Sequence, residues 1–249
     1  MYSATQALLE GARDYRWLLD QGYSDDAALK LVGDRLRLSR EERLILFRGV
    51  AASAPSRRRR ELLAASVRGR ELLIDGHNQA FTVMHYLNGR PLFLGSDGLL
   101  RDAGASHGHI VDRELFRRAL SLLGGAVAEA RPAAVLAYFD APITGSIGHA
   151  ALFREDLAAR GVEAVCAVEP SADGPLKKAG AGAAVATGDS AIVEALARRY
   201  GGGPQAGGVA VFDAARFAIE LAFGPAPSDH SWLDLAAELD GDPGRLAGR

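Results

Sequence analysis

The chain has 249 residues, 48% of them apolar, and a formal net charge of −2. This length and apolar content are sufficient for a real hydrophobic core, which excludes a disordered chain. No stretch approaches the roughly 18 continuous apolar residues of a membrane span, and the N-terminus lacks the basic, apolar and small-residue order of a signal peptide. We therefore expect a cytoplasmic globular protein. The single cysteine, Cys166, excludes an internal disulfide and a cysteine-based zinc site, and we expect a buried, inert thiol.

The charge is distributed unevenly along the chain. Residues 1–70 contain 14 Lys and Arg against 9 Asp and Glu, and the remaining residues contain 15 against 22. The two parts therefore carry +5 and −7. Such asymmetry is typical of a basic part that holds a polyanion beside an acidic part that holds cations.

Up to about residue 68, the apolar residues recur at helical spacing and predict four short helices. Ser3 and Ser39 each precede a Gln or a Glu by three residues, which is the spacing of a capping box. Ser24 gives a plainer helix start. The last of the four helices is expected within residues 56–70.

Four consecutive arginines lie in the first turns of this last predicted helix: Arg57, Arg58, Arg59 and Arg60. So many like charges do not stabilise the helix itself, so their side chains face solvent or a ligand. If the ligand is RNA, the arginines follow its backbone phosphates, and binding weakens as salt rises. A solvated helical face is the alternative interpretation.

From residue 71, short apolar runs alternate with helical segments. Strands are predicted at ELLID, AAVLAYFD, VEAVCAV, GAAVATGD and GGVAVFD, and helices near 111–130, 147–160, 190–200 and 213–223. Strands that are buried on both faces and joined by helices are typical of a largely parallel α/β sheet.

Three parts follow one another along the chain. They are a helical region over 1–69, an α/β domain over 70–224, and a tail over 225–249 that contains loops and a short helix. Within the α/β domain, the Asn-Gly pair at 88–89 separates two β-rich arms and predicts an inserted β-hairpin over 81–94.

Aspartates close four of the five predicted strands: Asp75, Asp140, Asp189 and Asp213. A fifth aspartate, Asp173, follows the strand VEAVCAV by a few residues. In a parallel sheet the ligand crevice lies beyond the carboxyl ends of the strands, so we expect these side chains at one edge. Each of them also has a separate structural interpretation, as a helix cap or an Asx-turn.

Several carboxylates at one edge repel one another and raise each other's pKa unless a cation lies between them. Hard divalent ions such as Mg²⁺ or Mn²⁺ take such oxygen ligands. A pair of these ions would activate water and stabilise the leaving oxygen in phosphodiester hydrolysis. The strand ends therefore predict a Mg²⁺ or Mn²⁺ site.

Two segments near these aspartates suit a phosphate. Asn78, in the stretch GHN after the first strand, donates to a phosphate or to water at the metal, or belongs to a tight strand-to-helix turn. The stretch ITGSIGHA, residues 143–150, presents backbone N–H groups and Ser146 at a helix start, or is an ordinary loop of small residues.

The ordered set LIDGHN, YFDAPITGS, PSADGPLKK and VATGDSAIV resembles the PIN and NYN superfamily of metal-dependent ribonucleases, over roughly residues 70–223. The chain as a whole resembles a prokaryotic family of unknown function with a helical N-terminal region. The first resemblance implies a PIN-like fold in which Asp75 is a metal ligand and Asp140 and Asp173 belong to the acidic set. It also implies that Asp189 and Ser190 complete that set.

Two features depart from the superfamily pattern. One is the predicted hairpin, and the other is the loop GSDGLLRDAGASHG, which adds Asp97, Arg101 and Asp102. These three side chains either close over the site or form a turn and a surface pair. His107 and His109 have a spacing that suits zinc but lack further ligands at suitable spacing, so an ordinary loop is the alternative.

We expect a divalent-metal-dependent ribonuclease whose partner is RNA. Its catalytic metal ligands are Asp75, Asp140, Asp173 and Asp189. Its substrate-binding residues are Asn78, Ser146, Ser190, Arg57, Arg58, Arg59 and Arg60, and its accessory residues are Asp97, Arg101, Asp102 and Asp213. The alternatives are a catalytically silent PIN-like module that binds RNA or a protein, and a metal-dependent small-molecule phosphatase. The sequence also allows a homo-oligomer.

Overall fold

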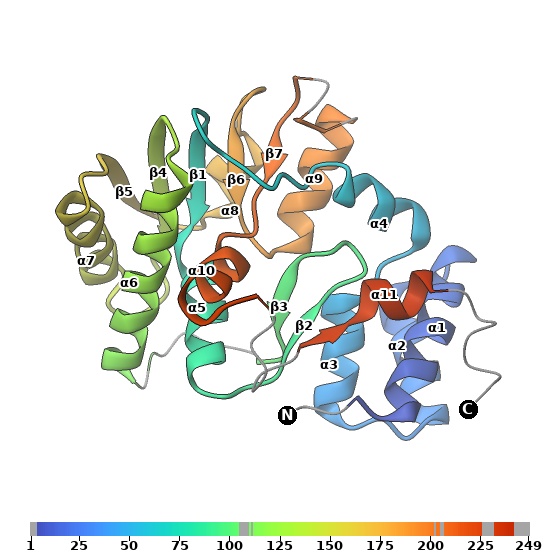
Figure 1. The fold of residues 1–249 in the computed structure, drawn as a ribbon. Coiled ribbons are helices and arrows are strands. Elements are labelled where there is room, and N and C mark those ends of the chain that lie inside the picture. Colours follow the sequence, from blue (N-terminus) through green and yellow to red (C-terminus); the bar gives the residue numbers. More distant parts are fainter. Residues whose placement is uncertain are drawn as a thin grey trace.

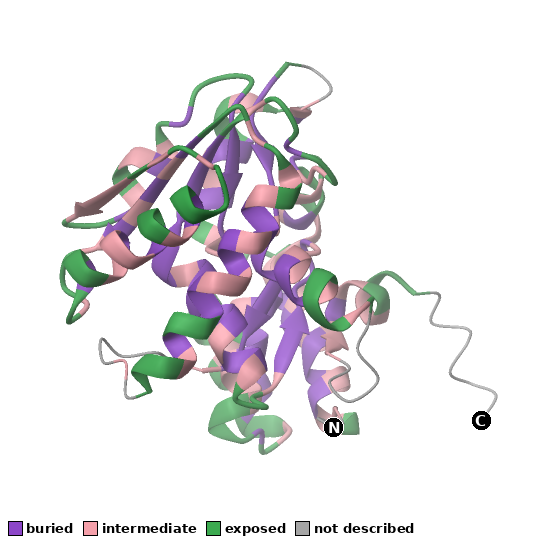
Figure 2. Cartoon of the chain, turned by 60° about the vertical axis from the view of Figure 1, so that its left-hand side comes forward, coloured by how far each residue is buried: buried purple, intermediate pink, exposed green. Residues whose placement is uncertain are grey.

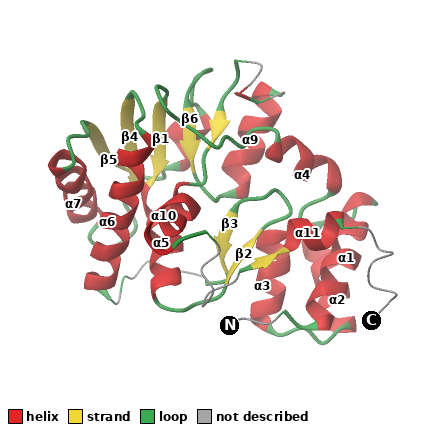
Figure 3. Cartoon of the chain, viewed as in Figure 1, coloured by secondary structure: helices red, strands yellow, loops and turns green. Residues whose placement is uncertain are grey.

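The computed structural model describes residues 4–104, 110, 112–201, 203–204, 207–225 and 232–241 (Figure 1). His107 and His109 lie outside the described residues. The chain forms a five-stranded parallel sheet with helices on both faces, a small three-stranded sheet, and an N-terminal group of helices (Figure 3). This arrangement confirms the predicted α/β class with a helical N-terminal region.

Four helices precede the first strand, as predicted: α1 (Gln6–Asp20), α2 (Asp25–Arg35), α3 (Arg40–Gly49) and α4 (Ser53–Arg60). Ser24 caps α2, and Ser39 forms a capping box with Glu42 at the start of α3. The start of α1 differs from the prediction, because its N-cap is Thr5, which accepts the N–H of Leu8. Ser3 lies outside the described residues.

The helix α4 ends ten residues earlier than the predicted range of 56–70. Leu62 is fully buried, and the chain beyond α4 becomes extended and pairs with the strand β7 (Ala210–Val211). The N–H of Val211 donates to the carbonyl of Leu62 at 2.7 Å, and the N–H of Ala64 donates to the carbonyl of Val211 at 2.9 Å. This pairing covers an edge of the sheet that would otherwise expose its backbone.

All five predicted strands are present: β1 (Glu71–Asp75), β4 (Ala134–Asp140), β5 (Ala164–Glu169), β6 (Ala184–Ala186) and β7. They pair in parallel in the order β5-β4-β1-β6-β7. Cys166 lies on the edge strand β5 and is half-buried rather than buried. Burial raises the pKa of its thiol to about 11, so the thiol stays protonated at neutral pH.

Helices cover both faces of the sheet (Figure 1). One face carries α5 (Gly76–Leu87), α6 (Arg113–Ala130), α7 (Ser146–Ala159) and α10 (Ala214–Phe223), and the other carries α8 (Asp173–Lys177) and α9 (Ser190–Tyr200). Leu72 and Ile74 of β1 belong to the first core, while Leu73 belongs to the second. The sheet is therefore buried on both sides (Figure 2), as parallel sheets are.

The inserted β-hairpin exists, but it lies further along the chain than the predicted range of 81–94. Its strands are β2 (Leu92–Leu94) and β3 (Leu100–Asp102), which pair antiparallel. The predicted first arm is the second half of α5, where Phe81, Val83 and Tyr86 are buried. The Asn-Gly pair ends this helix instead of turning a hairpin, since Asn88 is the C-cap and Gly89 has φ +66°.

The described part of the tail completes the small sheet. It contains β8 (Leu233–Asp234) and α11 (Leu235–Asp240), and the sheet order is β3-β2-β8. Phe93 of β2 and Leu235 of α11 share one hydrophobic cluster with Leu8 and Tyr15 of α1. The small sheet thus attaches the N-terminal helices to the rest of the molecule. None of the helices in the described ranges is long and apolar enough to cross a membrane.

Candidate functional site

Three of the predicted aspartates follow three adjacent strands of the parallel sheet. Asp140 ends β4, Asp75 ends β1, and Asp189 lies three residues beyond β6. The chain runs outward from β1 to β4 and β5, and then crosses to β6 and β7 on the other side. The order of the strands therefore reverses between β1 and β6, which is the point where open α/β sheets bind ligands.

Asp75 lies at the centre of this edge and is only 5% exposed. It caps α5 by accepting the N–H of Asn78 at 3.4 Å, and its second oxygen accepts the hydroxyl of Thr187 at 2.9 Å. Burial, and then the negative charges of Asp140 and Asp189, raise its pKa to about 7 against these two hydrogen bonds. Asp75 is thus a buried carboxyl group whose charge is not balanced by a cation among the described residues.

Thr187 connects two of the aspartates, and its role was not predicted from the sequence. Its hydroxyl donates to Asp75 and accepts the backbone N–H of Asp189 at 3.1 Å. The side chain is fully buried. The available signal was its place between the end of an apolar strand and the Gly-Asp-Ser segment, where a hydroxyl can satisfy neighbouring polar groups.

Asp140 is partly exposed and has different partners. One carboxylate oxygen accepts the N–H of Ala172 at 2.9 Å, and the other lies 3.6 Å from Nδ1 of His77. The His77 ring, together with the N–H of Ala172, lowers the pKa of Asp140 although partial burial opposes this. The bond to Ala172 joins the carboxylate to the start of α8, so Asp140 is not the local Asx-turn considered from the sequence.

A pair of histidines lies behind Asp140. Nε2 of His77 is 3.2 Å from Nδ1 of His149, and His77 packs among aromatic rings, including Phe81 and Phe139. Burial, and then the neighbouring His77 and Arg113, lower the pKa of His149 to about 4. His149 is therefore neutral at physiological pH. His77 was not predicted as a site residue, because its partner His149 is distant in the sequence and no local pattern connects the two.

Asp189 caps α9, which confirms the structural interpretation of its position. Its Oδ1 accepts the N–H groups of Ala191 at 2.6 Å and of Ile192 at 3.2 Å. Ser190 is the first residue of α9 and lines a cavity beside Asp189. The helix-capping and functional interpretations are compatible here, because one oxygen of a carboxylate can cap a helix while the other faces a ligand.

Asp173 is not brought into the same group. It is the first residue of α8, its side chain is 43% exposed, and it forms an ion pair with Lys177 at 2.6 Å. Within the described part of the chain, no three His, Cys, Asp or Glu side chains are gathered closely enough to hold a metal ion. The aspartates at the sheet edge therefore share an electrostatic environment without forming a closed set of ligands.

A buried ion pair beside Asp189 joins Asp97, in the loop between β2 and β3, to Arg101 of β3. Asp97 accepts two hydrogen bonds from Arg101, at 2.7 and 2.8 Å, and lies 3.6 Å from Arg59. Although burial favours its neutral form, Arg101 and then Arg59 hold the pKa of Asp97 below its usual range. Arg101 and Asp102, which the sequence allowed to be a surface pair, are both buried and have separate partners, so that pair is not formed.

The peptide of Gly188 is held from both sides. Nε of Arg101 donates to its carbonyl at 2.7 Å, and its N–H donates to Oδ1 of Asn78 at 2.7 Å. Oδ1 of Asn78 also accepts Nε2 of Gln79, so its Nδ2 hydrogens are the groups that Asn78 can offer to a ligand. Arg101 and Asn78 thus position the backbone directly before Asp189.

The remaining accessory candidates have structural partners. Asp102 pairs with His85 at 2.9 Å and Arg48 at 3.3 Å. Asp213 caps α10 and accepts the N–H of Leu100 at 2.7 Å, and burial raises its pKa to about 6. The Ser146 hydroxyl donates to the carbonyls of Asp140 and Ile143, so it supports the loop before α7 in place of facing a phosphate.

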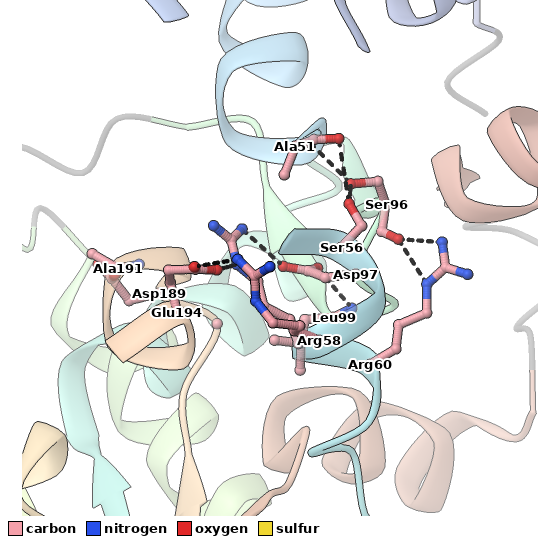
Figure 4. A network of polar contacts seen from close by, with 12 residues as sticks. Ala51, Ser56, Arg58, Arg60, Ser96, Asp97, Leu99, Asp189, Ala191 and Glu194 are labelled. Atoms are coloured by element: carbon pink, nitrogen blue, oxygen red, sulfur yellow. Dashed lines mark hydrogen bonds and ion pairs between the residues drawn. The ribbon is translucent and has the colours of Figure 1, made fainter. Parts of the chain in front are cut away.

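The four arginines lie in the last turn of α4, not in its first turns. Positive charge is favourable there, since it opposes the negative end of the helix dipole. Arg58 and Arg59 both pair with Glu194 of α9, at 3.0 and 2.8 Å. Arg60 pairs with Asp240 and donates to the carbonyl of Ser96 (Figure 4). Arg57 is exposed and forms no ion pair among the described residues.

A cavity of about 690 Å³ opens beside the sheet edge. One wall comes from α3 and the residues after it, including Phe47 and Arg48, and the other comes from Asn78 and the start of α9, including Asp189. The N-terminal helices therefore contribute to a cavity that Asp189 lines, whereas Asp75 and Asp140 are not among its lining residues. A volume of this order is typical of small-ligand sites.

The fold and the site define an α/β protein with a carboxylate-rich sheet edge and an added helical region. Residues 64–200 match the family described as Domain of unknown function (DUF5616), and the chain belongs to this family. Residues 7–61 match the family described as Protein of unknown function (DUF434). These two matches, together with the helices before the first strand, support the predicted family of unknown function with a helical N-terminal region.

An archaeal protein is similar to most of the chain. Uncharacterized protein MJ0935 of Methanocaldococcus jannaschii is 28% identical over 189 residues, which cover 75% of this chain and 89% of the relative. No solved structure matches the chain.

Proposed function

We propose that the chain is a divalent-metal-dependent ribonuclease that hydrolyses phosphodiester bonds at the carboxyl edge of its parallel sheet. The observation that carries this proposal is the convergence of Asp75, Asp140 and Asp189 beyond three adjacent strands, at the point where the strand order reverses. Among the described residues, none of the three forms an ion pair with an arginine or a lysine.

The donor chemistry of this edge fits Mg²⁺ or Mn²⁺. Carboxylate oxygens are the preferred ligands of hard cations, and among the described residues the buried carboxyl group of Asp75 has hydrogen-bond donors but no cationic partner. Mg²⁺ is usually held by one or two carboxylates with waters in the other positions, so it does not need a closed set of protein ligands. Asp75 and Asp189 would hold the ion, with Asp140 next to it. The bound metal supplies charge stabilisation at the phosphate and activation of water.

The residues around the edge would orient the substrate and the carboxylates. Thr187 fixes Asp75 and Asp189 relative to each other, because it bonds to both. Asn78 offers its Nδ2 hydrogens toward the cavity, where they suit a phosphate oxygen. Arg101 holds the carbonyl of Gly188 and so keeps the backbone before Asp189 in place.

The motif resemblance supplies the reaction class. The segments LIDGHN, YFDAPITGS and VATGDSAIV resemble PIN and NYN ribonucleases and contain the three aspartates of the sheet edge. The segment PSADGPLKK contains Asp173, whose pairing with Lys177 leaves it in an outer position in this proposal.

The test is cleavage of labelled single-stranded RNA by the full chain in the presence of Mn²⁺. We expect cleavage by the natural protein and its loss in Asp75→Asn and in Asp189→Asn. The matched control is Asp234→Asn, because Asp234 caps α11 in the same way, by accepting the N–H of Ala237, and lies in the small sheet. This control should cleave normally.

Other outcomes separate the alternatives. Binding of RNA without cleavage, in both the natural protein and the Asp75→Asn variant, would identify a silent binding module. Turnover of a phosphomonoester such as p-nitrophenyl phosphate, with no cleavage of RNA, would identify a phosphatase. Either result would overturn the ribonuclease proposal.

A further inference from the structure

The cavity that Asp189 lines contains one exposed aromatic ring together with polar groups. Phe47 of α3 is 49% exposed and lines the cavity, whereas its neighbours Ile45 and Leu46 are buried in the helical core. Asn78, Gly188 and Ser190 line the same cavity. An exposed aromatic ring in a cavity that also contains polar groups suits a flat ring whose edges form hydrogen bonds.

Several arginines surround one carboxylate, that of Glu194, at the rim of the same cavity. This carboxylate is shared by Arg58, Arg59 and Arg198, at distances of 2.8 to 3.0 Å. Glu194, Arg59 and Arg198 line the cavity, and the Arg198 side chain is 73% exposed. Asp97 lies 3.6 Å from Arg59 and is bonded to Arg101, so four guanidinium groups share two carboxylates. The remaining positive charge favours an anion such as a phosphate.

The start of α9 offers little to such a phosphate. The N–H groups of Ala191 and Ile192 in its first turn donate to Asp189. The arginines at the rim are therefore the groups that would hold the backbone of a bound strand. They lie next to the cavity wall that contains Asp189.

We propose that this cavity holds one unpaired base of single-stranded RNA, stacked on Phe47, with a neighbouring phosphate at Arg58, Arg59 and Arg198. This inference rests on the proposed ribonuclease function and names its substrate class. Unstacked bases of single strands bind to aromatic side chains in this way. The bases of a duplex are already stacked and paired, so their faces do not reach Phe47.

The proposal gives the N-terminal helices a role in recognition. Phe47 belongs to α3, while the aspartates belong to the parallel sheet and to α9. The helical region would select the form of the nucleic acid, and the sheet edge would carry out the hydrolysis.

The test measures binding of a labelled single-stranded RNA oligonucleotide and of its duplex by fluorescence anisotropy, in the Asp75→Asn background so that no cleavage intervenes. Phe47→Leu should weaken binding of the single strand on the order of 10-fold and leave binding of the duplex unchanged. Trp17→Leu is the control, because Trp17 is 60% exposed on α1 and is not part of the cavity wall. This control should bind both forms normally.

A second variant guards against a change in folding. Phe47→Trp should retain binding of the single strand, and the fluorescence of the introduced indole should be quenched when RNA is added. Unchanged affinity in Phe47→Leu, or equal losses for single strand and duplex, would overturn the inference. An indole that shows no quenching would also overturn it.

These results are separable from the ribonuclease test. If the natural protein does not cleave RNA but binds single strands through Phe47, the hydrolytic proposal fails and this inference stands. If the natural protein cleaves RNA and Phe47→Leu cleaves and binds single strands equally well, the inference fails and the hydrolytic proposal stands.

Discussion

The sheet edge and the β2–β3 loop each contain a buried aspartate, and the pKa values of the two are shifted in opposite directions. Asp75 and Asp97 are 5% and 2% exposed, yet the pKa of Asp75 is raised to about 7 and the pKa of Asp97 is lowered. Asp97 has Arg101 and Arg59 beside it, whereas the partners of Asp75 among the described residues are a hydroxyl, one backbone N–H and two further carboxylates. Burial alone therefore does not determine the pKa of a carboxyl group, because neighbouring charges and hydrogen bonds also shift it.

The two regions differ in how a buried carboxylate is balanced. At the loop, the chain itself neutralises the buried carboxylate, and the ion pair then holds the backbone of Gly188. At the sheet edge, the chain leaves the charge unbalanced, which costs stability unless a ligand supplies a cation. Strongly perturbed carboxyl groups of this kind are frequent at functional sites.

The largest expected effect on stability is that of Asp97→Asn. This change leaves the buried guanidinium of Arg101 without its bidentate partner, so the free energy of unfolding should fall by about 3–5 kcal/mol. Urea denaturation at neutral pH measures this loss. A decrease below about 1 kcal/mol would show that Arg101 does not depend on Asp97 and would break the contrast with the sheet edge.

Asp75→Asn should have the opposite sign. The folded pKa of Asp75, about 7, lies above the ordinary value of 3.8, so the folded protein binds a proton that the unfolded chain releases. Stability therefore falls as pH rises between these two values. Without divalent metal at pH 8, the free energy of unfolding of Asp75→Asn should exceed that of the natural protein by on the order of 2–4 kcal/mol. Urea denaturation measures this difference.

The pH dependence of this difference is the decisive measurement. The advantage of Asp75→Asn should shrink as pH falls from 8 toward 4, because Asp75 of the natural protein is then protonated in the folded state, and its burial no longer costs the energy of a buried charge. The control Asp234→Asn, at an exposed helix cap, should show no such trend. A natural protein that is more stable than Asp75→Asn at pH 8 without metal would contradict the interpretation.

Local sequence patterns predicted the elements that carry the sheet edge. An apolar run that ends in an aspartate marks both a buried parallel strand and its carboxyl end, so the positions of Asp75, Asp140 and Asp189 followed directly. The caps at Ser24 and Ser39 are equally local. Patterns of this kind depend only on a few neighbouring residues.

The hairpin was placed wrongly because one sequence signal is typical of two different local structures. An Asn-Gly pair turns a hairpin, but it also ends a helix, and burial of Phe81 and Tyr86 decided for the helix. The role of Thr187 and the pairing of Asp97 with Arg101 depend on how the loop packs against α9, which one sequence does not specify. Distant pairings therefore required the structure.

Thr187→Val should have a smaller effect than either aspartate change. The substitution keeps the shape but removes the hydroxyl, which leaves the second oxygen of Asp75 and the N–H of Asp189 without this partner. We expect a loss of about 1–2 kcal/mol in the free energy of unfolding and a loss of cleavage on the order of 10-fold to 100-fold.

The matched control for Thr187→Val is Thr82→Val. Thr82 is also buried, but its hydroxyl donates to the carbonyl of Asn78 within α5 and touches no aspartate. Its change should leave cleavage close to normal. Equal effects of the two substitutions on cleavage would show that Thr187 has no special role at the sheet edge.

The smallest expected effect is that of Asp173→Asn, and it sharpens the comparison between balanced and unbalanced carboxylates. Asp173 is exposed and paired with Lys177, so its loss should change the free energy of unfolding by less than about 0.5 kcal/mol. The resemblance to PIN ribonucleases would make Asp173 a metal ligand, with a loss of cleavage like that of Asp75→Asn. The geometry predicts a much smaller loss, because Lys177 already balances this charge. Comparison of the two variants in the same Mn²⁺-dependent cleavage assay decides between these expectations, since a loss equal to that of Asp75→Asn would place Asp173 among the metal ligands.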